Sequence, residues 1–215
     1  MTARATDEGR GRAALQALRA ADPVLARLID ATPDGDLWTW RVRWPERPFA
    51  LLARSIVGQQ ISTQAANAIF GRLSQTLGGD VSAHMLTSRS DEALLEAGLS
   101  RAKLASLRDL SACVLSGELP LDRTDQLSDD ELRRRLTAVR GIGTWTAELF
   151  LLALGRDDAL PAADVGLRRA VRQAYGLDGL PSTAEVEALG ERWRPHRSLA
   201  ALLLYRSLRP DAGLE

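Results

Sequence analysis

Apolar side chains recur along most of the chain at the three- and four-residue spacing of an amphipathic α-helix. The clearest such segment follows Ser100, carries Leu104, Leu107 and Leu110 on one face, and stops at Gly117. Ser is a preferred residue at the start of a helix, and Gly is common just past its end. The pattern therefore predicts a helix between Ser100 and Gly117.

Similar signals predict helices through most of the remaining chain. They are expected over residues 24–29, 129–136, 165–175, 186–193 and 199–208, with two more starting near residues 49 and 63. Capping-box pairs, in which a Ser is followed three residues later by a Glu, precede two of these helices, at 128 and 131 and at 182 and 185. Strand-like alternation occurs only in residues 37–44, which are expected to form an extended arm or one short strand, and residues 1–12 are expected to be frayed. The sequence therefore predicts an all-α protein.

Composition excludes several classes of protein. The 215 residues carry 28 Lys and Arg against 28 Asp and Glu, so the net charge is zero and binding to a polyanion needs a local patch or backbone amides. The single Cys, Cys113, excludes a disulfide framework, a Cys-ligated zinc site and an iron–sulfur cluster within this chain. Because the chain has neither a long apolar run nor an N-terminal signal pattern, we expect a cytoplasmic protein without a membrane span.

Residues 136–147, which read LTAVRGIGTWTA, hold the most informative motif. A short helix runs into Gly141-Ile142-Gly143, and an apolar helix starts directly after it. The two glycines are expected to allow positive φ and a close backbone approach, and the first amides of the second helix have no partner within that helix. With the helix dipole, these amides form an anion site that needs no Lys. The alternative is an ordinary helical hairpin in which the glycines only turn the chain.

This motif resembles the helix-hairpin-helix of DNA-repair glycosylases, here expected at about residues 132–154. A second block, residues 160–169 (LPAADVGLRR), resembles the Pro-to-Asp part of the helix-hairpin-helix–GPD superfamily. Residues 52–62 (LARSIVGQQIS) and 192–198 (RWRPHRS) resemble the AlkA-type 3-methyladenine DNA glycosylases. The blocks stand in the family's order and cover roughly residues 22–208, which makes the resemblance specific.

The resemblance implies a two-lobed helical fold with the active-site cleft between the lobes and little or no N-terminal β domain. A central helical bundle with the hairpin is expected over residues 46–158, and C-terminal helices that carry the catalytic residue over residues 159–215. An N-terminal arm and helix, residues 1–45, would pack with the C-terminal lobe. The implied partner is double-stranded DNA containing alkylated bases, bound by a monomer that associates with the nucleoid.

Asp164 is the candidate catalytic residue. It stands at the start of the helix predicted over residues 165–175, where the helix dipole favours its ionised form. The connection over residues 155–163 can span up to about 30 Å, which is long enough to bring Asp164 back to the hairpin. By itself, an Asp at this place is an ordinary helix cap. In the resembled family the matching Asp is essential, whereas Ala163 stands where the family often has a second Asp.

An ionised carboxylate near DNA suits the cleavage of a base from deoxyribose. This reaction builds positive charge on the sugar, in an oxocarbenium-like state that a fixed anion stabilises. The same group can orient the attacking water. An alkylated purine already carries positive charge on its ring and leaves without a strong general acid, so one Asp can suffice.

Trp145 stands where relatives that also cut the DNA strand have a Lys that forms a Schiff base with the sugar. Trp cannot form that bond, and the only Lys, Lys103, lies in another predicted helix, so we expect a monofunctional hydrolase that uses water. The resemblance places Trp145 and Leu149 in the base pocket, where an aromatic face stacks on a cationic base. The alternative for Trp145 is packing in the core.

The target base lies inside the duplex, so it must be flipped out while a side chain fills the gap. The resemblance assigns this DNA wedge to the loop over residues 58–62, with Gln60 as the first candidate and Ile61 as the second. A Gln can also hydrogen-bond to the orphaned partner base. The alternative is that Gln59 and Gln60 merely join two helices.

The remaining site residues follow from the resemblance to the hairpin. The DNA phosphate is expected at Gly141, Gly143, Trp145 and Thr146. Relatives often bind a monovalent cation, Na⁺ or K⁺, with hairpin carbonyls, and the matching positions are Thr137, Val139 and Ile142. No other cofactor is expected.

The sequence therefore predicts a DNA glycosylase that hydrolyses the N-glycosidic bond of alkylated purines in base excision repair. Two alternatives stay open: a non-enzymatic protein that binds damaged DNA, and a glycosylase for deaminated or oxidised bases. Arg194 and Arg197 are either DNA-backbone contacts or part of a solvated helix face.

Overall fold

The computed structural model describes residues 3–32 and 47–208, and within these two ranges the regular secondary structure is helical, with no strand. This confirms the all-α prediction. The arm predicted over residues 37–44 lies outside the described residues. The chain divides into two compact units, one formed by Met1–Arg43 with Leu151–Glu215 and the other by Trp44–Phe150. The units divide at residue 150, inside a helix, whereas the lobe boundary expected from the sequence is at residue 158.

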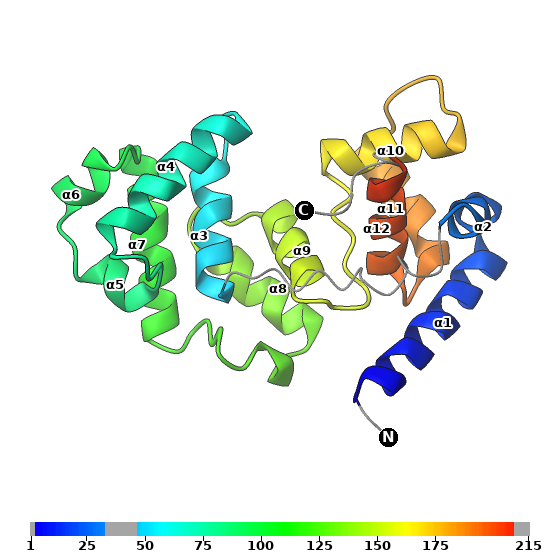
Figure 1. Cartoon of the computed structure of the whole chain (residues 1–215), viewed down its shortest axis with the longest axis horizontal. Helices are drawn as coiled ribbons and strands as arrows, with labels where there is room; N and C mark the ends of the chain where they lie inside the picture. Colours follow the sequence, from blue (N-terminus) through cyan, green and yellow to red (C-terminus); the bar gives the residue numbers. More distant parts are fainter. Residues whose placement is uncertain (1–2, 33–46, 209–215) are drawn as a thin grey trace. The chain divides into compact units, whose positions relative to one another are not determined.

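The unit formed by Trp44–Phe150 is built around the long helix α7 (Arg101–Leu115), which packs against α3, α5 and α6 (Figure 1). Helix α4 packs against α3 and α6. Leu107 and Leu110 of α7 are fully buried, together with Ile56 and Val57 of α3. The other helices of this unit are α3 (Pro48–Gly58), α4 (Thr63–Thr76), α5 (Ala83–Thr87), α6 (Asp91–Glu96), η1 (Thr124–Gln126), α8 (Asp129–Ala138) and most of α9 (Thr144–Ala153).

The second unit is built around α12 (Arg197–Ser207), which packs against α1, α2 and α10 (Figure 1). Trp193 is the largest fully buried side chain of its apolar core, which also takes in Leu18, Leu25 and Leu204. The other helices of this unit are α1 (Ala3–Ala21), α2 (Pro23–Asp30), α10 (Val165–Tyr175), α11 (Thr183–Gly190) and η2 (Glu191–Trp193).

A fully buried carboxylate, Asp22, ties three parts of this unit together. One of its oxygens accepts the amides of Val24 and Leu25 at 2.9 and 3.4 Å and thereby caps α2. The other accepts the Tyr175 hydroxyl at 2.5 Å and the Trp193 indole N–H at 3.0 Å. Burial raises the pKa of Asp22, but these hydrogen bonds outweigh it and hold the pKa below its ordinary value. The side chain is therefore an anion in a fully satisfied buried network.

Local capping signals predicted most helix ends correctly. Ser100 caps α7, and Gly117 follows its end with a φ of 81°. The capping box at Ser182 and Glu185 forms completely at the start of α11. At α8, Ser128 accepts the amide of its third residue as predicted.

Two of these local predictions were wrong. Residues 3–12, which were expected to be frayed, are helical, since α1 begins at Ala3 and its later residues Leu15 and Leu18 are buried in the core of their unit. The box at Ser128 is incomplete, because the Glu131 carboxylate accepts hydrogen bonds from Arg134 and Arg135. These two arginines lie one turn further along α8 and offer charged donors, which bind a carboxylate more strongly than a backbone amide does.

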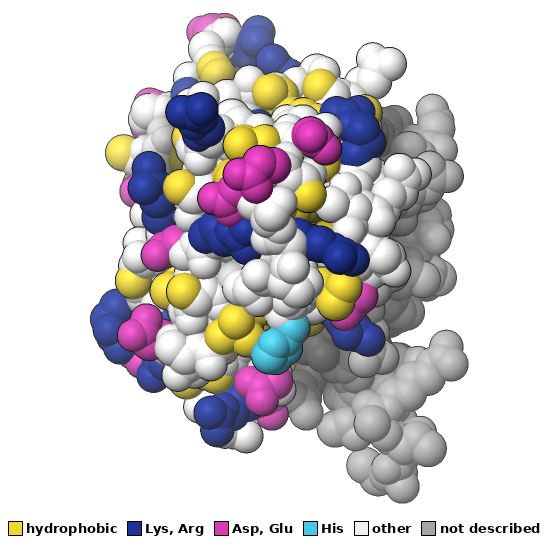
Figure 2. Space-filling view, turned by 90° about the vertical axis from the view of Figure 1, so that its left-hand side faces the viewer, with side chains coloured by type: hydrophobic (Ala, Val, Ile, Leu, Met, Phe, Trp, Pro, Cys, Tyr) yellow, Lys and Arg dark blue, Asp and Glu magenta, His cyan; other side chains and the backbone are white. Residues whose placement is uncertain are grey.

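The surface agrees with the balanced composition. Figure 2 shows the side at the left of Figure 1, where α5 and α6 lie, and there basic and acidic side chains are interspersed with scattered hydrophobic ones. Among the helices of the described ranges, none has the length and apolar character needed to cross a membrane.

Candidate functional site

The predicted hairpin is formed by α8, a short turn and α9. The turn directs its apolar side chains inward, since Val139 and Ile142 are only 2% and 4% exposed. The Ile142 amide donates to the Val139 carbonyl at 3.1 Å and closes the turn. Gly141 and Gly143 lie on the exposed side. The turn therefore presents bare backbone to solvent at the point where α9 begins.

The two glycines of the turn have different roles. Gly141 has a φ of 79°, and a Cβ there would lie 2.6 Å from the Ser106 hydroxyl of α7, so no larger residue fits. Gly143 lies outside the positive-φ region, and a Cβ there would meet nothing within 4 Å. The expectation of positive φ at both glycines is therefore wrong for Gly143. Its missing side chain leaves space beside the first amides of α9, which suits the approach of an external group.

Helix α7 contacts the start of the turn through a side-chain hydrogen bond. The Asp109 carboxylate accepts the Arg140 amide at 2.7 Å. This amide is therefore engaged within the protein, and the amides at the start of α9 are the ones in position to bind an anion. Asp109 could not be predicted from the sequence, since nothing in its own helix marks it as a partner of the hairpin.

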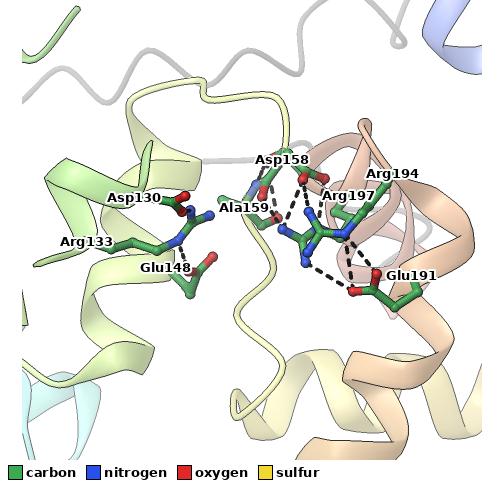
Figure 3. Close-up of polar contacts among 9 residues, drawn as sticks. Asp130, Arg133, Glu148, Asp158, Ala159, Glu191, Arg194 and Arg197 are labelled. Carbon is green, nitrogen blue, oxygen red and sulfur yellow. Dashed lines mark hydrogen bonds and ion pairs between the residues drawn. The ribbon is translucent and has the colours of Figure 1, made fainter. Parts of the chain in front are cut away.

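An ion pair links the two helices of the hairpin (Figure 3). Arg133 of α8 donates to Glu148 of α9 at 2.5 Å and to Asp130 at 2.9 Å. Burial lowers the pKa of Arg133, but the hydrogen bond and the charge of Glu148 raise it more, so the pKa lies above its ordinary value. Glu148 is only 9% exposed, so this pair is shielded from solvent and holds α8 and α9 together.

Trp145 and Leu149 lie one turn apart on α9. Trp145 is 38% exposed and Leu149 is half-buried, whereas Thr146 is buried. The core-packing alternative for Trp145 therefore does not hold. A large aromatic side chain on the first turn of α9, next to the bare backbone of the turn, can stack on a planar group.

The loop between α3 and α4 carries the wedge candidates. Gln60 has a φ of 60°, and no other non-glycine residue of the described ranges has a positive φ. Ile61 beside it is 38% exposed. The Gln59 side chain donates to the Gly141 carbonyl at 2.8 Å, so Gln59 does more than join two helices. It fixes the loop between α3 and α4 directly to the hairpin turn.

Lys103 also supports this loop. Its ammonium group donates to the Val57 carbonyl at 2.7 Å, in the last turn of α3. A cation at a helix C-terminus interacts favourably with the helix dipole. The chain's single Lys therefore caps the helix that leads into the wedge loop.

Asp164 lies at the start of α10, as predicted. Its Oδ1 atom accepts the Leu167 amide at 2.9 Å, and the side chain is half-buried. Val165 next to it is 47% exposed and Ala163 is also exposed, so the carboxylate stands at an accessible helix end. A Cβ on Gly166 would lie 2.8 Å from Asp164 Oδ1, so this glycine leaves the room that the carboxylate occupies.

The connection before Asp164 is anchored to the start of α12 (Figure 3). Arg197 binds the Asp158 carboxylate at 2.7 and 3.0 Å, and Arg194 binds it at 2.5 Å. The Ser198 hydroxyl accepts the Ala159 amide at 2.8 Å. Both arginines hold the segment that leads to Asp164, a role that the sequence did not predict, and whether they also contact the DNA backbone stays a prediction. Residue spacing could not reveal this, since Asp158 and Arg197 are 39 positions apart.

The hairpin carbonyls are the only predicted metal ligands. Among the described residues, no group of three or more His, Cys, Asp or Glu side chains could hold a metal ion. The Val139 carbonyl already accepts one hydrogen bond, from Ile142, and a carbonyl oxygen has two lone pairs. The turn therefore retains acceptor capacity for a monovalent cation.

A family model described as "HhH-GPD superfamily base excision DNA repair protein" matches residues 53–195, a range that contains the wedge loop, the hairpin and Asp164. The chain belongs to this superfamily. In this chain, the helix-hairpin-helix motif of the superfamily comprises α8, the turn at Gly141 and Gly143, and α9.

Three matches illustrate how this HhH-GPD chain relates to known proteins. DNA-3-methyladenine glycosylase 1 of Schizosaccharomyces pombe is 32% identical over 75% of this chain and 73% of its own. A solved S. pombe 3-methyladenine DNA glycosylase, in complex with abasic DNA, matches with a TM-score of 0.75 at 30% identity, over 90% of this chain and 95% of that one. A DNA-3-methyladenine glycosidase of Bacillus halodurans matches with a TM-score of 0.70 at 37% identity, over 76% of each chain.

Proposed function

We propose that the chain is a monofunctional DNA glycosylase that hydrolyses the N-glycosidic bond of alkylated purines, such as 3-methyladenine and 7-methylguanine, in base excision repair. The observation that carries this proposal is the match, over nine-tenths of the chain, to a 3-methyladenine DNA glycosylase solved with abasic DNA. The exposed hairpin backbone and the accessible Asp164 carboxylate supply the chemistry that this reaction needs.

Asp164 supplies the charge for the chemical step. As the bond between the sugar C1′ and the base nitrogen breaks, its electron pair leaves with the base and positive charge develops on the sugar. The carboxylate stabilises that charge and orients a water molecule, whose hydroxyl joins C1′ and whose proton is released. The side chain caps the N-terminus of α10, where the Leu167 amide holds one of its oxygens in place.

The hairpin binds the DNA strand. The amides of Gly143, Trp145 and Thr146 at the start of α9, and the turn at Gly141, hold a backbone phosphate. A monovalent cation on the carbonyls of Thr137, Val139 and Ile142 would add positive charge beside the same phosphate, and no step of the reaction depends on it.

The wedge loop and the first turn of α9 handle the flipped nucleotide. Gln60 enters the space that the extruded base leaves, with exposed Ile61 beside it. The exposed Trp145 ring, with Leu149 one turn further on, forms the surface on which a cationic alkylated base stacks.

Base release is the experiment that tests this function. Methylated duplex DNA incubated with the protein should release free 3-methyladenine and 7-methylguanine, measured by chromatography, while undamaged duplex should release no base. Duplexes that contain uracil, hypoxanthine or 8-oxoguanine form a comparison panel. Release from these alone would favour the glycosylase for deaminated or oxidised bases. Damage-specific binding without release from any duplex would favour the non-enzymatic alternative.

The proposed absence of strand cleavage has its own test. Borohydride added during turnover should trap no covalent complex between protein and DNA, because Trp145 lacks an amine and Lys103 is bound to the Val57 carbonyl. Denaturing gel electrophoresis of labelled DNA measures the complex, and a Lys103→Arg variant serves as control. A trapped species that disappears in this control would identify Lys103 as a nucleophile and contradict a purely hydrolytic mechanism.

A further inference from the structure

The hydroxyl of Tyr205, in α12, is a buried polar group that the proposed mechanism does not use. It is inaccessible to solvent and has no hydrogen-bond partner among the described residues. A buried donor without a partner is destabilising and rare in native proteins. A state that offers the hydroxyl an acceptor would remove this cost.

The Asp164 carboxylate is the candidate acceptor, because it is the charged group that acts on the Tyr205 hydroxyl. Both groups border the position that a Cβ on Gly166 would fill, with Asp164 Oδ1 at 2.8 Å and Tyr205 Cε1 at 3.4 Å from it. These two distances place Tyr205 Cε1, which is bonded to the carbon that bears the hydroxyl, within about 6 Å of the carboxylate oxygen. Burial, followed by the charge of Asp164, raises the pKa of Tyr205, so the phenol keeps its proton and remains a donor.

We propose that Tyr205 is a positioning residue for Asp164, whose hydroxyl donates a hydrogen bond to the carboxylate and fixes its orientation when substrate is bound. This inference rests on the proposed function. The Leu167 amide already holds Oδ1 from within α10, and Tyr205 adds a donor from a different helix. A carboxylate held by donors on two elements has less freedom to turn away from the developing charge on the sugar.

Tyr205→Phe tests the inference because it removes only the hydroxyl. The variant should lower kcat by about tenfold or more and change KM by less than about twofold, since the hydroxyl acts on a group that stabilises the transition state. Its melting temperature should stay equal or rise, because no hydrogen bond of the free protein is lost. An unchanged kcat would overturn the inference.

Tyr175→Phe is the matched control, since it removes the other buried phenol that faces a carboxylate in the same unit. Tyr175 donates to Asp22 at 2.5 Å, so its loss should lower the melting temperature and leave kcat unchanged. The opposite responses of the two variants separate positioning of Asp164 from general support of the fold. If Tyr205→Phe lowered the melting temperature as Tyr175→Phe does, without a kcat effect, Tyr205 would be a structural residue only.

A double-variant cycle ties the effect to Asp164. In an Asp164→Asn background, Tyr205→Phe should cause no further loss in the single-turnover rate, because the carboxylate it positions is absent. An equal loss in both backgrounds would overturn the inference. Wild-type protein provides the reference: if it released no base, the proposed function would fail together with this inference, whereas an active wild type with an equally active Tyr205→Phe would refute the inference alone.

Discussion

Asp164→Asn is expected to lower the rate of base release by about a hundredfold or more, which is the scale of losing one charge-stabilising group at a reaction centre. Asn keeps the shape of the side chain and can still accept the Leu167 amide, and Asn and Asp are equally good at starting a helix. The substitution therefore removes the negative charge and leaves α10 in place.

The measurement is a single-turnover assay with protein in excess over methylated duplex, together with DNA affinity and thermal unfolding. DNA affinity should be kept or increase, because one negative charge near the phosphates is lost. The melting temperature should stay close to that of the wild type. A variant that folds, binds and turns over at the wild-type rate would remove Asp164 from the mechanism.

Gly166→Ala is the companion variant because it keeps the negative charge of Asp164 but moves the carboxylate from its place. The new Cβ would meet Asp164 Oδ1 at 2.8 Å, so the carboxylate has to shift by a few tenths of an ångström. Ala favours a helix over Gly by up to about 1 kcal/mol, so the unfolding free energy should not fall. Turnover should fall about tenfold, since catalysis is sensitive to small displacements. Unchanged turnover would show that the reaction tolerates this shift.

Asp22→Asn is expected to lower the unfolding free energy by about 3 kcal/mol, the scale of breaking a buried charged network. If the Asn oxygen continues to accept the amides of Val24 and Leu25, its NH₂ group replaces the oxygen that accepts from Trp193. Two donors then face each other without solvent. The control is Asp30→Asn on the same helix, where the exposed ion pair with Arg19 contributes at most about 1 kcal/mol.

The difference in unfolding free energy between the wild type and Asp22→Asn depends on pH through the pKa of Asp22. Its folded-state pKa lies below the value of an unfolded Asp, which is about 3.9. The stabilisation by Asp22 is therefore fully present above about pH 4 and declines as the pH falls through the folded-state pKa. Urea unfolding of the wild type and of Asp22→Asn, measured between neutral and acidic pH, should show their unfolding free energies converging at the acidic end. A constant difference would mean that the charge of Asp22 contributes nothing.

The sequence predicted the features that depend on neighbouring residues. Ser100, Ser128, Ser182 and Asp164 each start a helix and cap it as expected, because a cap joins a side chain to an amide two or three positions away. The start of α1 was missed because its stability comes from Leu15 and Leu18, which are buried by helices distant in the sequence.

Many hydrogen bonds that hold the candidate site in place could not be predicted from the sequence, because they join residues that are distant along the chain. The bonds from Gln59 to Gly141 and from Arg197 to Asp158 join residues 82 and 39 positions apart. Apolar periodicity reveals which face of a helix is buried, but it does not reveal which polar side chain of one element meets the backbone of another. Tyr205 was hidden among the apolar residues of α12 for this reason.

The bond between Gln59 and Gly141 also bears on how the protein would search DNA. It joins two loops of one compact unit, so under the proposed function it would restrict the spacing between the bound phosphate and the wedge side chain. This spacing would then stay nearly constant while the protein moves along DNA. At each step along the duplex it would interrogate the nucleotide at a fixed offset from the phosphate it holds, and a weakened base pair would be recognised by its willingness to open at that one place.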